Sequence, residues 1–312
     1  MNPIFIGGCS RSGTTLLGSM LGAHPRAITT PESPFKIHPL VARYRHHGCR
    51  LTRKDIELLI DDWFLAIWRL SLDPHKLMAE IDPPTPRAVV TWLVTAYAER
   101  QGKRQFETWV DHTPANIRYV KTLQEHFPGA RFIHLVRDGR AVAASVMKLD
   151  WGPNTPKEAA QWWTSYVAYG LAAEHALSDQ QILRVRYEDL LAEPVETLER
   201  ITAFCGIDFD EDMLTACGFR VPEYTARQHR LVGQPLCRER IDAWKSELRE
   251  REIDIFEYYT GEALAYLGYP LAFDRLAGPP STYEKLSMEF RETTLRCWNK
   301  CRFAIRKRRY VA

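Results

Sequence analysis

Residues 4–22 combine the features of an anion-binding loop. The apolar run Ile4–Ile6 predicts a short buried strand, and the apolar residues within 16–21 recur at the spacing of one helix face. The small residues 7–15 join the two. A connection of this kind directs backbone N–H groups and the positive end of the helix dipole at one place. The segment therefore predicts a cradle for a phosphate-like group.

The loop differs at one position from loops that bind nucleoside triphosphates. Gly8 and Gly13 have the spacing of a Walker A motif, but Thr14 stands where that motif has its lysine. The nearest cation is Arg11, inside the loop. We therefore expect a phosphate-like ligand other than the β- and γ-phosphates of ATP. The alternative is an ordinary tight turn, which the coincidence of Arg11 with paired threonines disfavours.

Strand-like and helix-like segments alternate along the chain. The predicted strands are 4–6, 27–30, 106–110, 131–136 and 182–186. The predicted helices include 55–72, 86–100, 141–147, 155–177, 194–205, 239–249 and 253–267. This alternation predicts an α/β fold of three layers, in which helices flank a central parallel sheet.

Polar side chains follow the predicted strands. Glu32 follows the second strand, His112 the third and Arg137 the fourth. Tyr187 follows the fifth, and Ser145 lies on the first turns of the helix after Arg137, facing back toward the strand end. Open α/β sheets bind ligands at the carboxyl ends of their strands, so Glu32 is a candidate for a site. Glu32 taken alone is equally well explained as a solvent-exposed loop carboxylate.

Length and composition indicate a globular protein. With 312 residues, 45% of them hydrophobic and 26% charged, the chain can bury a substantial core. The formal net charge of +3 gives no reason to expect nucleic acid as a partner. We expect a single domain at 1–275, with a helical insertion on the acceptor side at about 36–100, and a basic C-terminal extension at 276–312.

The cysteine pattern and the hydropathy of the chain indicate the cellular compartment of the protein. The seven cysteines are odd in number and contain no CxxC pair, which disfavours a disulfide framework or a zinc site and fits a reducing environment. No signal-peptide pattern precedes the first strand, and no apolar stretch approaches the roughly 20 residues that span a bilayer. We expect a cytoplasmic protein.

Two further segments allow more than one interpretation. The aromatic residues Trp63, Phe64, Trp68 and Trp92 of the insertion belong either to the core or to the wall of a substrate cleft. Residues 291–309 contain eight Lys and Arg against one Glu, with apolar residues between them. The segment 291–312 is therefore either a peripheral contact with an anionic membrane or a packed terminal helix.

Three motifs together resemble a known family. Ser10–Thr15 resembles the 5′-phosphosulfate loop of sulfotransferases that use PAPS (3′-phosphoadenosine 5′-phosphosulfate). Leu135–Arg140 with Ser145 resembles their 3′-phosphate site, and Arg186–Leu190 is similar to a third conserved box of the family. The resemblance covers about residues 3–270 and is strongest to the tyrosylprotein and bacterial carbohydrate branch. It implies a P-loop NTPase-like sulfotransferase fold.

The resemblance also implies how the donor PAPS and the product PAP are bound, without a metal. The 5′-phosphosulfate would contact the loop and the start of the following helix, and the 3′-phosphate would contact the residues after the fourth strand. The donor-binding residues expected in this way are Arg11, Ser12, Gly13, Thr14, Thr15, Leu16, Arg137, Ser145, Tyr187 and Arg227.

The resemblance leaves two candidates for the general base. Glu32 lies 21 residues after Arg11, where tyrosylprotein sulfotransferases have a proposed catalytic glutamate. His112 stands where that branch has a lysine and where the cytosolic branch has its catalytic histidine. We expect Glu32 to be the base, while His112 and Arg11 stabilise the sulfuryl group or the leaving oxygen. The alternative gives His112 the role of base.

The acceptor is less well defined by the sequence. A hydroxyl of a carbohydrate, glycolipid or other small molecule is favoured, and a peptide tyrosine is the alternative. A kinase-like phosphotransferase is disfavoured by the missing loop lysine. A non-catalytic nucleotide-binding module is disfavoured by the presence of Arg11, Glu32, Arg137 and Ser145. An oligomer is compatible with the sequence.

Overall fold

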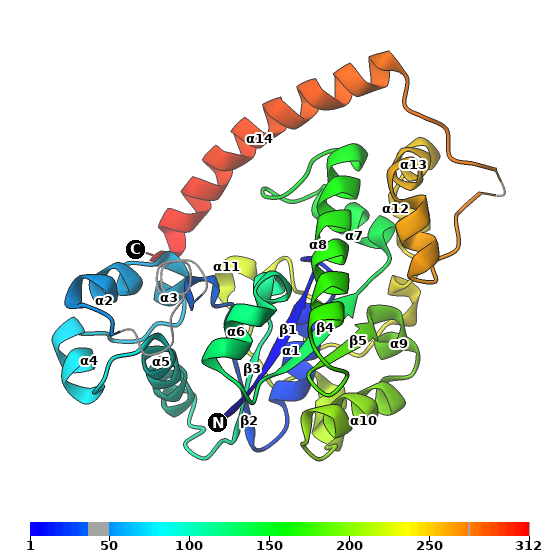
Figure 1. The fold of residues 1–312 in the computed structure, drawn as a ribbon. Helices are drawn as coiled ribbons and strands as arrows, with labels where there is room; N and C mark the ends of the chain where they lie inside the picture. Colours follow the sequence, from blue (N-terminus) through cyan, green and yellow to red (C-terminus); the bar gives the residue numbers. More distant parts are fainter. Residues whose placement is uncertain (37–49, 274, 312) are drawn as a thin grey trace.

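A five-stranded parallel sheet forms the centre of the molecule (Figure 1). The computed structural model describes residues 1–36, 50–273 and 275–311. The strands are β1 (Asn2–Gly8), β2 (Ala27–Thr30), β3 (Thr108–Asp111), β4 (Arg131–Val136) and β5 (Ile182–Arg186), in the order β2-β3-β1-β4-β5. The predicted α/β class and parallel sheet are confirmed.

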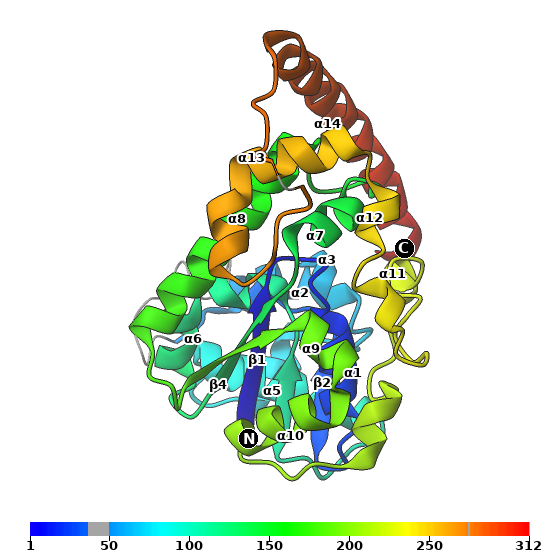
Figure 2. The ribbon, with the colours of Figure 1, turned by 90° about the vertical axis from the view of Figure 1, so that its right-hand side faces the viewer.

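Helices cover both faces of the sheet, because side chains alternate along each strand. In β1, Phe5 faces a cluster with Trp109 and Phe132, while Ile4 and Ile6 face a second cluster on the other side. The second cluster is covered by α1 (Thr14–Gly22), α9 (Tyr187–Ala192) and α10 (Pro194–Cys205). The first is covered by α5 (Pro86–Arg100), α6 (Val120–His126) and α8 (Pro156–Ala176) (Figure 2).

The order of the strands places a crevice at the carboxyl end of β1. The chain adds β3 on one side of β1 and β4 on the other, so the direction of the crossovers reverses at this strand. Open α/β sheets bind ligands at such a point. The loop between β1 and α1 lies there, and α7 (Gly139–Val146) begins beside it, after β4.

The insertion between β2 and β3 is helical but more broken than predicted. After the short 3-10 helix η1 (Pro34–Lys36), it contains α2 (Arg53–Ile60), α3 (Trp63–Ala66), α4 (Pro74–Glu80) and α5. A single helix over 55–72 is wrong, because the side chain of Asp62 accepts the Phe64 N–H and starts a new helix there. Residues 37–49 of this insertion lie outside the described residues.

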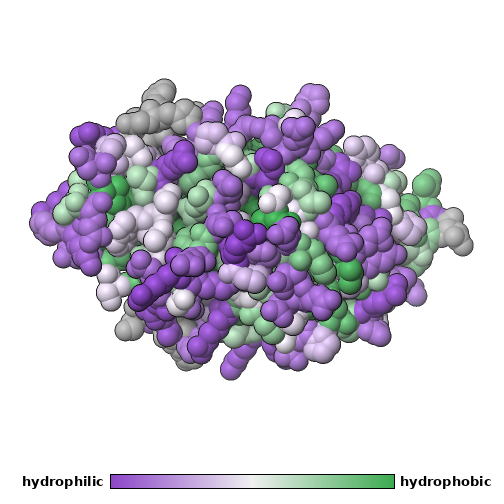
Figure 3. Space-filling model, turned by 90° about the horizontal axis from the view of Figure 1, so that it is seen from below, coloured by the Kyte–Doolittle hydropathy of each residue, from purple (hydrophilic) through white to green (hydrophobic). Residues whose placement is uncertain are grey.

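The remaining described elements are mostly short. They are the 3-10 helices η2 (Pro114–Arg118), η3 (Glu211–Thr215) and η4 (Arg238–Arg240), together with α11 (Glu223–Ala226), α12 (Trp244–Glu247) and α13 (Glu250–Tyr266). The predicted helix 239–249 is therefore interrupted. The face seen from below, at the amino ends of the strands, is mostly hydrophilic with apolar residues interspersed (Figure 3).

The C-terminal helix α14 (Thr282–Val311) runs across the carboxyl side of the sheet. Both ribbon views place its C-terminal end beside α3 and α11 (Figures 1 and 2). Among the helices that the structure describes, none combines the length and the apolar character needed to cross a bilayer.

Candidate functional site

The loop between β1 and α1 has an unusual backbone. Arg11 has a φ of 76° and Gly13 a φ of 99°, both in the left-handed region. A Cβ at Gly13 would lie 2.5 Å from the Tyr187 ring, so only glycine fits there. Arg11 is not a glycine, and a positive φ at such a residue stores strain that often accompanies function.

Most of the predicted donor-binding residues line one cavity of about 110 Å³, called here the donor cavity. Its walls combine the loop, the start of α1, the end of β4 with α7, and the segment 228–240. The lining residues are Arg11, Gly13, Thr14, Thr15, Leu16, Arg137, Ser145, Tyr187, Gln228, His229, Leu231, Val232 and Arg240. The residues that the resemblance assigned to donor binding therefore lie together, although some are more than 100 positions apart in the sequence.

Hydrogen bonds connect Arg11 of this cavity with Ser145 and Arg137. Arg11 Nε donates to Ser145 Oγ at 3.0 Å, and Arg137 Nη1 donates to the Arg11 carbonyl at 2.8 Å. The Arg137 guanidinium lies 4.2 Å above the Tyr187 ring. Burial, and then the charge of Arg137, lower the pKa of Arg11 to about 10. Two neighbouring cations that destabilise each other are stabilised by an anion placed between them.

The donor cavity fits the charge of a nucleotide with two anionic ends, but its volume is small. Pockets for small molecules usually measure about 300–1,000 Å³. The segment 228–232 covers the cavity, and the Gln228 carbonyl accepts from Arg11 Nη2 at 2.7 Å. A ligand as large as a nucleotide would therefore extend beyond this volume or displace the segment.

Two predicted donor-binding residues lie elsewhere. Arg227 is exposed and lines neither this cavity nor the one beside it, whereas the next two residues, Gln228 and His229, line both. Ser12 is buried, and its N–H donates to the Cys9 carbonyl at 3.0 Å. A donor contact of Arg227 therefore stays a prediction, and no sequence pattern distinguishes the inward from the outward residues of an irregular loop.

A second cavity, of about 250 Å³, adjoins the first and is called here the acceptor-side cavity. The two share Arg11, Thr14, Thr15, Gln228 and His229. The other lining residues are Ser10, Glu32, Trp63, Phe64, Pro114, Trp151, Tyr224, Thr225, Phe303 and Arg306. Aromatic rings form most of its outer wall, and Glu32 is its carboxylate.

Glu32 has the protonation behaviour of a general base. Burial, and then the charge of Asp111, raise its pKa to about 7, while Arg11 and Lys36 oppose the shift. A base works best when its pKa is close to the operating pH. Above about pH 7, Glu32 is therefore mostly ionised and can accept a proton.

A buried ion pair lies beneath Glu32. Lys36 Nζ is 2.7 Å from Asp111 Oδ2 and donates to Asn116 Oδ1 at 2.9 Å, with both charged side chains almost fully buried. Burial opposes ionisation of Asp111, but Lys36 and hydrogen bonds outweigh it and lower the pKa to about 2. This network, which sequence reasoning missed, fixes the chain that follows Glu32, because Lys36 Nζ also donates to Ser33 Oγ at 2.9 Å and the Ser33 N–H donates to Thr113 Oγ1 at 2.8 Å.

The structure places His112 outside both cavities, contrary to the expectation of a catalytic contact. Its ring packs on Phe219 at a centroid distance of 5.0 Å, and a Cβ at Gly18 would lie only 2.9 Å from the His112 Cβ. Neither ring nitrogen has a hydrogen-bond partner among the described residues. Asp111 and His112 are consecutive, so they point to opposite sides, and His112 faces α1. Burial lowers its pKa to about 4.

The fold and the two cavities together define a class of protein. A P-loop-like parallel sheet, with an arginine-containing anion cradle at its switch point and a carboxylate in the adjoining cavity, is the arrangement of a group-transfer protein. The sequence pattern of the Sulfotransferase family matches residues 3–211. The chain belongs to this family, as the three motifs predicted.

Individual relatives agree with this assignment. The chain is 23% identical over 216 residues to protein-tyrosine sulfotransferase A of Caenorhabditis elegans, covering 68% of this chain and 51% of the relative. It is 27% identical to the nodulation protein NoeE of Sinorhizobium fredii, covering 85% and 65%. The sulfotransferase domain of a Synechococcus olefin synthase has the same fold, with 25% identity, a TM-score of 0.58 and coverage of 86% and 96%. The chain spans about half or less of the first three relatives it matches.

Proposed function

We propose that this protein transfers a sulfuryl group from PAPS to a hydroxyl of an acceptor and releases PAP. The observation that carries the proposal is the shared wall of the two cavities. Arg11, Thr14 and Thr15 line both, so a group held at the start of α1 is reached from the side of Glu32. Membership of the sulfotransferase family supports the choice of sulfuryl over phosphoryl transfer.

The donor would use the cationic residues of the donor cavity. The start of α1, with Thr14 and Thr15, would hold the 5′-phosphosulfate, and Arg137 with Ser145 would hold the 3′-phosphate. PAPS supplies the activated sulfuryl group. Arg11 lies between these two sets, so its positive charge would stabilise negative charge that develops on the leaving oxygen.

The acceptor hydroxyl would react from the acceptor-side cavity. Its oxygen forms a bond to sulfur while the bond from sulfur to the 5′-phosphate oxygen breaks, and PAP keeps that electron pair. Glu32 accepts the hydroxyl proton. Most of the rate enhancement then comes from positioning and from charge stabilisation by Arg11 and the start of α1.

Nucleotide titration tests the donor. PAP should bind in the absence of Mg²⁺, as measured by calorimetry, and ATP should not compete at similar concentrations. Labelled sulfate should pass from PAPS to a component of a mixed hydroxyl-compound pool. Binding of ATP with Mg²⁺ and no binding of PAP would instead favour a kinase-like phosphotransferase.

The acceptor class is a separate question. A hydroxyl on a small molecule or carbohydrate is our first choice, because the acceptor-side cavity of about 250 Å³ suits one ring. A peptide tyrosine is the second candidate, since several relatives carry the name protein-tyrosine sulfotransferase. A tyrosine-containing peptide and its phenylalanine analogue, each offered with labelled PAPS, would separate the two.

A further inference from the structure

The outer wall of the acceptor-side cavity comes from the C-terminal helix. Phe303 and Arg306 of α14 line the cavity that also contains Glu32. The Phe303 ring meets the Trp63 ring edge-on at 5.6 Å, and Trp63 in turn meets Tyr224 at 5.3 Å. Both α14 residues lie far beyond the segment 3–211 that matches the family pattern. The family pattern therefore does not describe this part of the wall.

Specific polar contacts hold α14 on the cavity. Arg306 Nη2 is 2.9 Å from Asp150 Oδ1, and Arg306 Nη1 donates to the Tyr224 carbonyl at 3.2 Å. Further along the helix, Asn299 Nδ2 donates to Asn154 Oδ1 at 2.8 Å. The loop that carries Asp150 and Asn154 also carries Trp151, another residue of the cavity wall.

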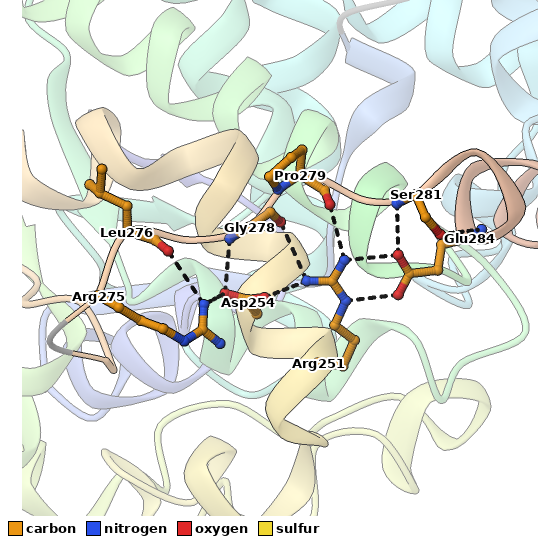
Figure 4. Close-up of polar contacts among 8 residues, drawn as sticks. All are labelled: Arg251, Asp254, Arg275, Leu276, Gly278, Pro279, Ser281 and Glu284. Carbon is orange, nitrogen blue, oxygen red and sulfur yellow. Dashed lines mark hydrogen bonds and ion pairs between the residues drawn. The ribbon is translucent and has the colours of Figure 1, made fainter.

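The start of α14 is fixed as well (Figure 4). Arg251 of α13 binds both carboxylate oxygens of Glu284, at 2.7 and 2.8 Å, and donates to the Pro279 carbonyl at 3.1 Å. Asp254 accepts from Arg275 and from the Gly278 N–H in the same network. The segment before α14 is thus clamped to the domain, and α14 is anchored along its length.

A third cavity, of about 380 Å³, continues the acceptor-side cavity beneath α14. The two share Trp151 and Phe303, so these rings stand at the junction. Trp162 of α8 lies on one side, with its ring 6.3 Å from that of Trp151, and Lys300 of α14 lies on the other. The space available to an acceptor therefore extends beyond one ring.

We propose that α14 forms part of the acceptor site and selects hydroxyl compounds with a flat, apolar body longer than one ring. The hydroxyl-bearing ring lies beside Glu32, and the second ring lies between Trp151 and Phe303 at the junction of the two cavities. Flat rings gain from offset or edge-on contacts with aromatic side chains. This inference rests on the proposed function and names its acceptor class.

The test compares phenol with 4-phenylphenol, which differ by one ring. With PAP present, calorimetry on the full chain should show 4-phenylphenol binding about tenfold or more tightly than phenol. Phe303→Ala should remove most of this difference and leave the affinity for PAP and for phenol within about twofold. Phe290→Ala is the matched control, because Phe290 is 76% exposed on the same helix. Circular dichroism confirms that both variants are folded.

Separate outcomes apply to the two proposals. Binding of 4-phenylphenol that depends on Phe303, without any sulfuryl transfer to hydroxyl compounds, would refute the proposed function and leave the site standing. Sulfuryl transfer to other hydroxyl compounds, with Phe303→Ala and Phe290→Ala indistinguishable in 4-phenylphenol binding, would overturn the role of α14.

The outer face of α14, which points away from the domain, supports a second and independent proposal. Its large apolar side chains Tyr283, Leu286, Phe290, Trp298 and Ile305 are 57–80% exposed and lie within one face of the helix. That face points away from Asn299 and Phe303, which contact the domain. The sequence of α14 contains nine Lys and Arg against three Glu. A second copy would bring two strongly positive helices together, whereas an anionic surface complements them.

We therefore infer that this outer face binds an anionic lipid surface. Vesicles of phosphatidylglycerol should co-sediment the full chain, and vesicles of phosphatidylcholine should retain at least about tenfold less. The double variant Phe290→Glu and Trp298→Glu should abolish retention, whereas Leu58→Glu, an exposed leucine on α2, should not. Equal retention of the double variant and the wild type would refute the inference. The inference would also be refuted if the wild type formed a dimer in sedimentation velocity that the double variant dissociates and Leu58→Glu does not.

Discussion

Replacing Glu32 by glutamine tests the base and its environment together. In the folded protein, burial and Asp111 raise the pKa of Glu32 from 4.5 to about 7. A raised pKa means that the fold favours the protonated carboxyl, so the contribution of Glu32 to stability is fully present below about pH 4.5 and is lost as the pH rises through about 7. The full shift corresponds to about 3 kcal/mol.

Glutamine resembles the protonated carboxyl and does not ionise. Glu32→Gln should therefore be more stable than the wild type by up to about 3 kcal/mol at pH 8, and by about 1 kcal/mol or less at pH 5. The same change removes the proton acceptor, so turnover should fall by about 10² to 10⁴ while PAP affinity stays unchanged. The wild-type turnover should rise with pH through about 7 as Glu32 ionises.

Thermal unfolding at the two pH values, calorimetry with PAP, and turnover between pH 5.5 and 8.5 check these outcomes. Glu32→Asp is a useful control, because it retains a carboxylate but withdraws it from the acceptor-side cavity by about one methylene. The reasoning is refuted by a Glu32→Gln variant with near wild-type turnover. A wild-type turnover that is flat across pH 7 would contradict it equally.

Three further predictions concern the donor cavity and its neighbours. Arg137→Ala should weaken PAP by about 10- to 100-fold, from the loss of a charge-assisted contact, but leave adenosine 5′-phosphosulfate, which lacks the 3′-phosphate, nearly unaffected in calorimetry. His112→Asn should lower the free energy of unfolding by about 1–3 kcal/mol in urea titrations and leave turnover within about twofold, because the ring lies outside both cavities. His229→Ala should change the affinities for both PAP and the acceptor, whereas Arg227→Ala, an exposed neighbour, should change neither.

The sequence predicted the structure best where one local pattern determines whether a segment is a strand or a helix. Apolar segments that alternate with helical ones indicated all five strands, because β1 to β4 are almost continuously buried and β5 buries Ile182 and Val185. The resemblance to sulfotransferases placed Arg11, Arg137 and Ser145 in one site, and the fold brings them together because β1 and β4 are parallel neighbours that end at the same edge. The helix boundaries at Asp62 and after Arg240 were harder, since a single capping side chain or an irregular turn outweighs a continuous apolar pattern.

Other site residues depend on contacts that no local pattern encodes. His112 follows a strand as Glu32 does, but its position in the pleat turns its ring toward α1, and only the sheet register decides that. Phe303 lies about 270 residues after Glu32 in the sequence, and its place in the cavity depends on how α14 packs. The sequence allowed a packed terminal helix at 291–312, but nothing in its composition indicates which part of the domain the packed face contacts.

Arg11 connects the charge of the donor with the strength of the base. Burial and the charge of Asp111 raise the pKa of Glu32, and the charge of Arg11 is the largest effect that opposes this rise. An anion bound beside Arg11 would offset part of that positive charge, and the pKa of Glu32 would then rise above about 7. The pH dependence of kcat reports the complex with bound substrates, whereas that of kcat/KM for PAPS reports the free enzyme. The apparent pKa in kcat should therefore exceed that in kcat/KM, and Arg11→Met should raise the pKa in kcat/KM, because it removes the cation that lowers the pKa of Glu32 in the free enzyme. Equal pKa values in kcat and kcat/KM of the wild type would show that the bound donor does not act on Glu32.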